Sequence, residues 1–301
     1  MTIRTLAVVG TGLIGTSVAL AASRHRVTVY LADRDESALH TAAARGAGRA
    51  ETPPHPVDLA VLAVPPSQIA PVLAQVQAQG LARSYTDVAS VKARPEREIL
   101  STAPDPSSYV GGHPMAGRER SGPLAARAEL FRDRPWVLTP TRFTTKPAFD
   151  RALGLIALCG GVPRVMRARA HDDAVALTSH APHLLASLMA ARLRDGPVPA
   201  ARLAGQGLRD VTRIARGDSR LWGDIVESNA AAVADVLTRL QEELAGVLAA
   251  LYDLAEPDGG GPGGPGPETR GKSRHTLVDL LERGIAGVGE LSDERADGTD
   301  R

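Results

Sequence analysis

The chain has 301 residues, 43% of them hydrophobic and 23% charged, which is typical of a soluble globular protein and excludes fibrous or wholly disordered classes. This length allows about two domains with substantial cores. The 35 Lys and Arg residues balance 34 Asp and Glu residues and are scattered, which argues against nucleic acid or an anionic membrane as a partner. The single cysteine, Cys159, excludes an internal disulfide and lies in an apolar run typical of a buried thiol.

The N-terminal sequence MTIRTLAVVGTGLIG has no charged leader followed by a cleavage site. Glycines interrupt its apolar stretch well before the roughly 20 residues that span a bilayer. We therefore expect a cytoplasmic protein without a membrane segment, whose fold begins at this sequence.

The first half of the chain alternates between short apolar runs and Ala-rich or Arg-rich stretches. The apolar runs predict strands over residues 3–9, 27–31, 59–64, 86–88 and 109–111, with a last strand near 163–166. The stretches between them predict helices, including one over 148–159. Continuously apolar strands that alternate with helices predict an α/β fold with a parallel sheet covered on both faces.

The second half is predicted to be helical. Long helices are expected over about 171–194, 199–215 and 220–254, followed by a Gly/Pro-rich linker and a short helix over about 275–288. The helix that ends near residue 254 is more apolar than a solvent-facing helix needs, so we expect it to pack also against a second copy. The expected domains are a dinucleotide-binding domain (1–168), a helical substrate and dimerisation domain (169–254), a flexible linker (255–273), and a C-terminal helix and tail (274–301).

The glycine motif Gly10-Thr-Gly-Leu-Ile-Gly15 lies between the first predicted strand and helix, and Asp33 ends the second strand. In this context the glycines allow a pyrophosphate to rest on the helix N-terminus, and the carboxylate accepts hydrogen bonds from ribose hydroxyls. A carboxylate repels a 2′-phosphate, so NAD is expected, although the adjacent Arg34 leaves NADP open. The alternatives are a tight turn without ligand and a solvated Asp33. The expected cofactor contacts are Gly10, Gly12, Leu13, Ile14, Gly15, Asp33, Val64 and Pro65.

Two further motifs, DVASVK (87–92) and GGHPMAGRERSG (111–122), each follow or end a predicted strand. Loops at the carboxyl ends of parallel strands border the cofactor crevice, so Ser90 and His113 are expected to face the nicotinamide. Removal of a hydride from a carbinol requires loss of the hydroxyl proton, for which a neutral imidazole is the usual base. His113 is therefore the predicted proton acceptor. The alternative is a structural histidine hydrogen-bonded in a turn.

In the helical half, His180 and His183 lie three residues apart on one predicted helix face. This spacing could form a metal pair, but no third ligand completes it, so we expect no metal. Contact with substrate is expected for His183 and simple packing for His180. The planar guanidinium of Arg213 suits a carboxylate ligand, and the open alternative is an interhelical ion pair with Asp210 or Asp224.

Five motifs occur in order between residue 3 and about residue 254: GTGLIGTS, DVASVK, GGHPMAGRERSG, HDDAVALTSHAPHLLA and GLRDVTRIARGDSRLW. This combination resembles the prephenate/arogenate dehydrogenase family of tyrosine biosynthesis. The resemblance implies a Rossmann-type NAD-binding domain, a helical dimerisation domain, a homodimer, and an active site between the two domains. It also implies residue roles: His113 accepts the proton of the substrate C4 hydroxyl, Ser90 hydrogen-bonds near that hydroxyl, Arg213 binds a carboxylate, His183 lies at the substrate side chain, Trp222 shapes the pocket, and Glu119 lies near its mouth.

The activity implied by the resemblance is NAD-dependent oxidative decarboxylation of prephenate to 4-hydroxyphenylpyruvate. Arogenate, or an amino-deoxyprephenate of secondary metabolism, is the alternative substrate. A non-catalytic NAD-binding regulator is the alternative of a different class. A site selective for arogenate would be expected to place an acidic residue near the amine. This chain has His183 there, which favours prephenate. Ala181 and Gln206 depart from the family pattern, which leaves the shape of the pocket open.

Overall fold

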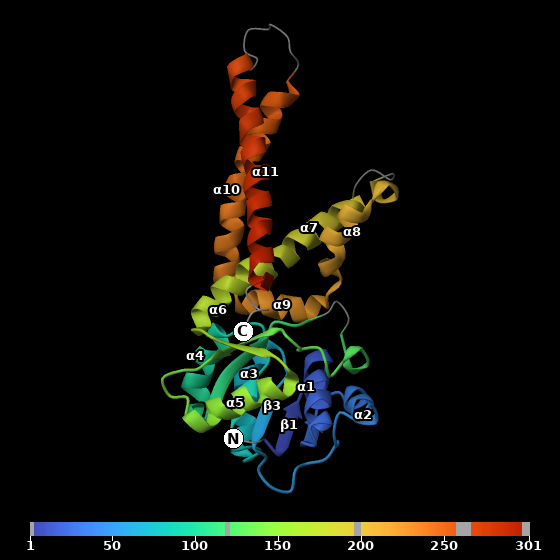
Figure 1. Ribbon diagram of the computed structural model, residues 1–301, viewed down its shortest axis with the longest axis vertical. Coiled ribbons are helices and arrows are strands. Elements are labelled where there is room, and N and C mark those ends of the chain that lie inside the picture. The colour runs from blue at the N-terminus through green and yellow to red at the C-terminus, as the bar shows by residue number, and fades with distance from the viewer. Residues whose placement is uncertain (1–2, 118–120, 196–199, 257–265, 297–301) are drawn as a thin grey trace. The chain divides into compact units, whose positions relative to one another are not determined.

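The computed structural model describes residues 3–117, 121–195, 200–256 and 266–296. The chain forms two compact units, residues 1–233 and 234–301. The first unit contains the sheet and the candidate functional residues. The second contains most of one long helix and the C-terminal helix (Figure 1).

Within the described residues, seven strands form one sheet in the order β2-β1-β3-β4-β5-β6-β7. The strands are β1 (Thr5–Val9), β2 (Thr28–Ala32), β3 (Leu59–Leu62), β4 (Tyr85–Asp87), β5 (Tyr109–Pro114), β6 (Pro135–Thr139) and β7 (Val162–Val165). Adjacent strands run parallel except β5 and β6, which are antiparallel. The α/β class is confirmed, with the sheet mainly parallel.

β6 is not among the predicted strands, and it adds one antiparallel pair to the sheet that was predicted to be parallel. A parallel neighbour needs a long crossover, usually a helix, whereas an antiparallel neighbour does not. The described residues between β5 and β6 contain only one short 3₁₀ turn, Pro123–Ala125, and no α-helix. The chain therefore returns alongside β5 in the opposite direction.

Helices cover both faces of the sheet, which accounts for its continuously apolar strands. The helices are α1 (Leu13–Arg24), α2 (Glu36–Ala44), α3 (Ile69–Ala78), α4 (Ala93–Thr102) and α5 (Lys146–Cys159). In β1, Leu6 and Val8 belong to a core cluster that includes Leu155 of α5. Ala7, between them, points to the other face and belongs to a cluster that includes Leu73 of α3. Side chains that alternate between two buried faces leave no polar face on the strand.

The remaining helices of the first unit follow the sheet. α6 (Ala168–Val175), a π-helical turn (Ala176–His180) and α7 (Ala181–Asp195) continue one another, and α8 (Gln206–Thr212) and α9 (Ser219–Ser228) come later. The helix predicted over 199–215 is in fact divided, since 3₁₀ turns flank α8 at Ala200–Leu203 and Arg213–Arg216.

The helix predicted over 220–254 is also divided, at Asn229. This residue leaves the helical region with φ −118° and separates α9 from α10 (Ala230–Ala255). Its side chain donates hydrogen bonds to the Asp172 carbonyl oxygen (2.8 Å) and to His180 Nδ1 (3.2 Å). These tertiary contacts hold the break, and the apolar spacing of the sequence does not reveal them.

In the second unit, α11 (Pro267–Ala296) runs beside α10 (Figure 1). The Ser273 hydroxyl donates to the Asp253 carboxylate (2.7 Å), and Arg283 pairs with Glu243. α11 therefore extends beyond the predicted bounds 275–288 and occupies part of the predicted linker 255–273. A proline at the first helical position and an acidic residue in the first turn favour this earlier start. Residues 257–265 lie outside the described residues.

The helical run Ala168–Arg194 is long and apolar enough, by length and composition, to cross a membrane. It carries the buried polar side chains of His171, Asp172 and His180. These side chains hydrogen-bond to β5, to the loop before α4 and to Asn229. These contacts join the first part of the run to the rest of the first unit.

Candidate active site

The turn between β1 and α1 has the geometry of a phosphate-binding loop. Gly10 has φ +101°, and a Cβ there would lie 2.2 Å from the Ala63 carbonyl oxygen. A Cβ on Gly15 would lie 2.0 Å from the Gly10 carbonyl oxygen. Only glycine fits at these two positions, because the turn packs closely against the residue that follows β3.

Gly12 differs, since a Cβ added there would meet nothing within 4 Å. Gly12 is the N-cap of α1, supplies no side-chain hydrogen bond to the helix, and no acidic residue occupies the first turn. The first amide groups of α1 therefore face an open surface with the partial positive charge of a helix N-terminus. These residues fit the pyrophosphate of a dinucleotide.

Asp33 directly follows β2 and fastens this turn. Its Oδ2 accepts hydrogen bonds from the Thr11 amide (2.5 Å) and the Thr11 hydroxyl (2.8 Å), while Oδ1 accepts from the Asp35 amide (2.9 Å). Asp33 is thus more than a solvated turn residue. A carboxylate oxygen can accept two hydrogen bonds, so Oδ1 retains capacity for a ribose hydroxyl.

The other expected cofactor contacts lie around the same turn. Leu13 and Ile14 form the first turn of α1, and Val64 and Pro65 follow β3. All four residues are half-buried. Their contact with cofactor stays a prediction.

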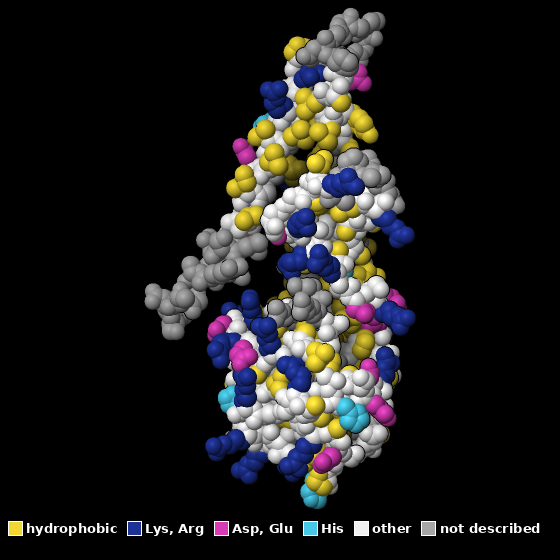
Figure 2. Space-filling view, turned by 90° about the vertical axis from the view of Figure 1, so that its right-hand side faces the viewer, with side chains coloured by type: hydrophobic (Ala, Val, Ile, Leu, Met, Phe, Trp, Pro, Cys, Tyr) yellow, Lys and Arg dark blue, Asp and Glu magenta, His cyan; other side chains and the backbone are white. Residues whose placement is uncertain are grey.

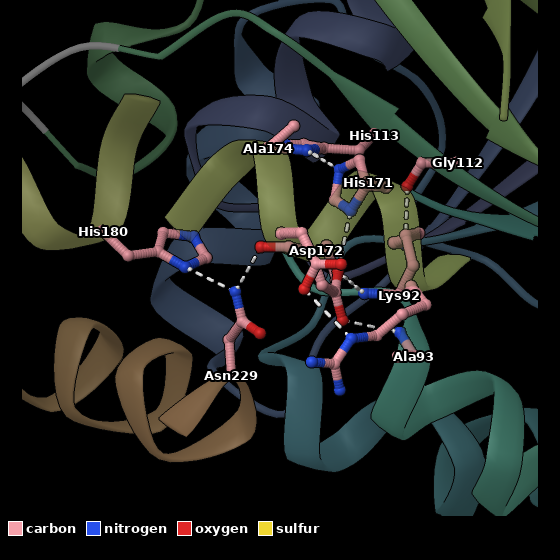
Figure 3. A network of polar contacts seen from close by, with 12 residues as sticks. Lys92, Ala93, Gly112, His113, His171, Asp172, Ala174, His180 and Asn229 are labelled. Atoms are coloured by element: carbon pink, nitrogen blue, oxygen red, sulfur yellow. Dashed lines mark hydrogen bonds and ion pairs between the residues drawn. The ribbon is translucent and has the colours of Figure 1, made fainter. Parts of the chain in front are cut away.

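His113, on β5, belongs to a chain of hydrogen bonds that reaches α6 (Figure 3). Its Nδ1 lies 2.8 Å from Nε2 of His171, and Nδ1 of His171 lies 2.8 Å from Oδ1 of Asp172. The Asp172 carboxylate also accepts the backbone N–H groups of Lys92 and Ala93, each at 2.8 Å. The N-terminus of α4 therefore holds the carboxylate, and the carboxylate holds His171 against His113.

A buried ion pair joins the ends of β4 and β5 beside this chain. The ammonium of Lys92 pairs with the Asp87 carboxylate and donates to the Gly112 carbonyl oxygen (2.7 Å). Asp87 also accepts from the Tyr109 hydroxyl and from the Ala89 amide. Lys92 and Asp87 are almost completely buried, so the pair is shielded from solvent and fixes the backbone next to His113.

The environment of His113 keeps its imidazole neutral. Burial, together with the neighbouring His171, Lys92 and His180, lowers the pKa of His113 well below its ordinary value of 6.5. Near pH 7 the ring is therefore in the form that can accept a proton. Burial likewise lowers the pKa of Lys92, an effect that the Asp87 carboxylate opposes.

A second group of rings lies on α7, the π-helical turn and α9. The rings of His183 and Trp222 are stacked, with centroids 3.5 Å apart and planes at 11°. His180 is buried, and Asn229 donates to its Nδ1. Nε2 of His180 and Nδ1 of His183 are buried without a hydrogen-bond partner. Because such atoms are costly to leave unpaired, they are candidates to bind polar groups of a ligand.

The structure locates the remaining predicted residues as follows. Ser90 is half-buried after β4, in the loop between Asp87 and Lys92. Arg213 is largely exposed in the 3₁₀ turn after α8, and that turn packs against α7. Glu119 lies outside the described residues. Within the described ranges, no group of three or more His, Cys, Asp or Glu side chains could hold a metal ion.

Sequence reasoning missed His171, Asp172, Asp87 and Lys92. His171 and Asp172 begin the motif HDDAVALTSHAPHLLA, and Asp87 and Lys92 are the ends of DVASVK. The signal in the sequence is the pair of opposite charges at the two ends of DVASVK, next to an apolar strand, which is typical of a buried ion pair. Contacts such as His113 to His171, 58 positions apart, are not visible in local patterns.

A doubly covered, mainly parallel sheet with a glycine turn at a helix N-terminus, and a neutral histidine on another strand of the same sheet, defines a dinucleotide-binding dehydrogenase. Residues 17–165 match the family model described as prephenate dehydrogenase, nucleotide-binding domain, and residues 167–257 match prephenate dehydrogenase, dimerization domain. The chain belongs to the prephenate dehydrogenase family and is an NAD-dependent oxidoreductase.

Individual relatives agree with this assignment. The chain is 43% identical to "Probable prephenate dehydrogenase NovF" of Streptomyces niveus, over 94% of this chain and 76% of the relative. It is 33% identical to cyclohexadienyl dehydrogenase of Zymomonas mobilis, over 79% of this chain and 85% of the relative. The crystal structure of Aquifex aeolicus prephenate dehydrogenase with hydroxyphenyl propionate and NAD+ has the same fold, with a TM-score of 0.76, 23% identity, and coverage of 94% and 99%.

Proposed function

We propose that this chain catalyses the NAD-dependent oxidative decarboxylation of prephenate to 4-hydroxyphenylpyruvate. The observation that carries the proposal is the neutral imidazole of His113, held on β5 in a chain that matches both domain models of the family. The names of the relatives in Streptomyces niveus and Zymomonas mobilis support the same substrate class.

The reaction requires a group that accepts one proton from the substrate and later returns it. The C4–H bond of the ring breaks as a hydride leaves, the ring carboxylate departs as CO2, and the ring becomes aromatic. NAD+ bound at the turn between β1 and α1 supplies the hydride acceptor. His113 takes the proton of the C4 hydroxyl as the hydride leaves and returns it to the phenolate oxygen afterwards. Prephenate and NAD+ thus give 4-hydroxyphenylpyruvate, CO2 and NADH, with no net proton released.

Other residues orient the substrate in this proposal. The Ser90 hydroxyl hydrogen-bonds the C4 hydroxyl, and the Arg213 guanidinium binds a carboxylate as a planar fork. His183 and Trp222 contact the substrate side chain. Positioning of this kind supplies a large part of the rate enhancement, because the enzyme then holds substrate, hydride acceptor and base in the geometry in which they react.

The His183 environment favours prephenate over arogenate. Burial lowers the pKa of His183 below 6.5, so its ring is neutral near pH 7. A neutral ring stacked on Trp222 offers no negative charge to the ammonium group of arogenate, whereas it can donate to a keto oxygen.

The proposal includes a homodimer that is located in the cytoplasm. Each chain contributes a dinucleotide-binding domain (1–168) and a helical substrate and dimerisation domain (169–254). Exposed apolar side chains along α10 and α11 support the second copy (Figure 2). They are Leu244, Leu248, Leu251, Tyr252, Val278, Leu281, Ile285 and Val288. Contiguous exposed apolar surface of this kind marks an interaction site.

The test follows NADH formation by the purified chain with prephenate or arogenate, each offered with NAD+ or NADP+. We expect turnover with prephenate and NAD+, and little with NADP+ because Asp33 repels a 2′-phosphate. Turnover with arogenate alone would overturn the choice of substrate. Absence of NADH with both substrates would overturn the function.

A further inference from the structure

The Asp172 side chain is fixed by three N–H groups on other residues. Oδ1 accepts from the Lys92 amide and faces Nδ1 of His171, and Oδ2 accepts from the Ala93 amide. Asp172 is only 2% exposed, so no solvent competes for these bonds. An aspartate carboxylate has acceptors and no donors, and therefore the proton between Asp172 and His171 belongs to Nδ1 of His171.

This assignment determines the protons on both imidazoles. In the neutral form of His171 this proton is the only N–H of the ring, so Nε2 is a bare acceptor. The contact of 2.8 Å between Nε2 of His171 and Nδ1 of His113 then requires the proton on Nδ1 of His113 (Figure 3). The rings meet at 77°, which makes this an edge contact through the nitrogens rather than a stacking contact. Nε2 of His113 is left with a lone pair.

We propose that His171 and Asp172 are positioning residues that hold His113 in the Nδ1–H tautomer, so that Nε2 faces the substrate hydroxyl as a proton acceptor. The inference rests on the proposed function, in which His113 is that acceptor. Neutral histidine in water prefers the opposite tautomer, with the proton on Nε2, which would donate to the hydroxyl instead of accepting from it. Asp172 and His171, here called the relay, therefore keep His113 in a tautomer that is disfavoured in water but productive in the reaction. Buried carboxylates have the same role toward histidines in other enzymes.

The first test compares variants that remove or retain the group at residue 171 that accepts the hydrogen bond from Nδ1–H of His113. In H171L the acceptor is lost, and we expect kcat to fall about 10²-fold or more, within the contribution of about 10²–10⁴-fold typical of a general base. KM for prephenate and the affinity for NAD+ stay close to those of the wild type. In H171Q the amide oxygen lies near the former Nε2 position and accepts from His113, so most of kcat returns.

The matched control is R169Q, on the same helix. Arg169 is largely exposed and pairs only with Asp173 in the described contacts, so this variant keeps the wild-type kcat. Thermal unfolding of each variant separates loss of fold from loss of the tautomer. Equal kcat values for H171L and the wild type would overturn the relay, as would H171Q being no more active than a folded H171L.

The second test reads the tautomer directly and needs no substrate. With all 8 histidines labelled with ¹⁵N, comparison with H113N assigns the His113 ring in the NMR spectrum of the full chain. We expect a proton on Nδ1 and none on Nε2 in the wild type, and the reverse in H171L. A proton on Nε2 of wild-type His113 would overturn the proposal.

The two proposals fail in different ways. If the wild type forms no NADH from either substrate, the proposed function fails, while the tautomer measurement still decides the relay. If the wild type is active and H113N is inactive but H171L is fully active, the relay fails and the function stands.

Discussion

At the residue scale, the chemistry depends on the protonation state of His113. The sequence predicts His113 and Ser90, because a short motif after an apolar strand is typical of a catalytic loop in a parallel sheet. It does not predict His171 or Asp172 as partners, because β5 and α6 meet only in the folded chain. The neutral state of the ring arises from burial and from neighbours distant in sequence.

Buried histidines make stability depend on pH. Burial lowers the pKa of His113 well below 6.5 and that of His180 to about 4. Below pH 6.5 these histidines are protonated in the unfolded chain but stay neutral in the folded chain. The free energy of unfolding is therefore highest above pH 6.5 and falls as the pH decreases toward 4. Urea unfolding at a series of pH values measures this slope.

The matched variant for the pH dependence is H180F, which removes one of these groups. Its free energy of unfolding should depend less on pH over the same window. A wild-type protein whose stability stays constant through the window would contradict the burial of these rings in neutral form.

At the scale of elements, local patterns predict most strands and helices but not where tertiary contacts interrupt them. Helix α1 and the strands of the βαβ unit follow from apolar spacing and glycines. The break at Asn229 and the reversed β6 do not, because each depends on contacts with distant elements. α11 is longer than its apolar pattern predicts. Its polar composition gives a weak apolar period, while ion pairs between residues four positions apart stabilise the helix.

The carboxyl ends of β4 and β5 depend on the buried pair of Lys92 and Asp87. K92M removes the ammonium and leaves the Asp87 carboxylate buried without its counter-charge, which should lower the free energy of unfolding by about 3–5 kcal/mol. Urea unfolding gives this value. The control is K146M, whose partner in an exposed pair is Asp150, with an expected change within about 0.5 kcal/mol. Equal losses in both variants would contradict the structural role of the buried pair.

At the scale of the whole molecule, the order of motifs predicts the nucleotide-binding domain, the helical domain and the family, and the family models confirm these predictions. The bounds of the domains and the homodimer stay predictions. In the second unit, α10 and α11 leave Leu248 and Ile285 exposed although both are large and apolar. A second copy of the chain would bury such side chains.

Light scattering on a gel-filtration column tests the dimer. The wild type should elute with twice the mass of one chain. L248E and I285E each bring a charge into the apolar surface and should yield monomers, because an unpaired charge is costly to bury. T238E, a change at an exposed polar position of α10, should remain dimeric. A monomeric wild type at micromolar concentration would refute the dimer.

The central claim is that His113 accepts the hydroxyl proton during oxidative decarboxylation of prephenate. The most direct measurement is NADH and 4-hydroxyphenylpyruvate formation from prephenate and NAD+ by the wild type and by H113N, with NAD+ affinity measured for both. We predict equal amounts of the two products in the wild type, and in H113N a fall in kcat of about 10²–10⁴-fold with NAD+ affinity retained. An H113N variant with wild-type kcat would contradict the account.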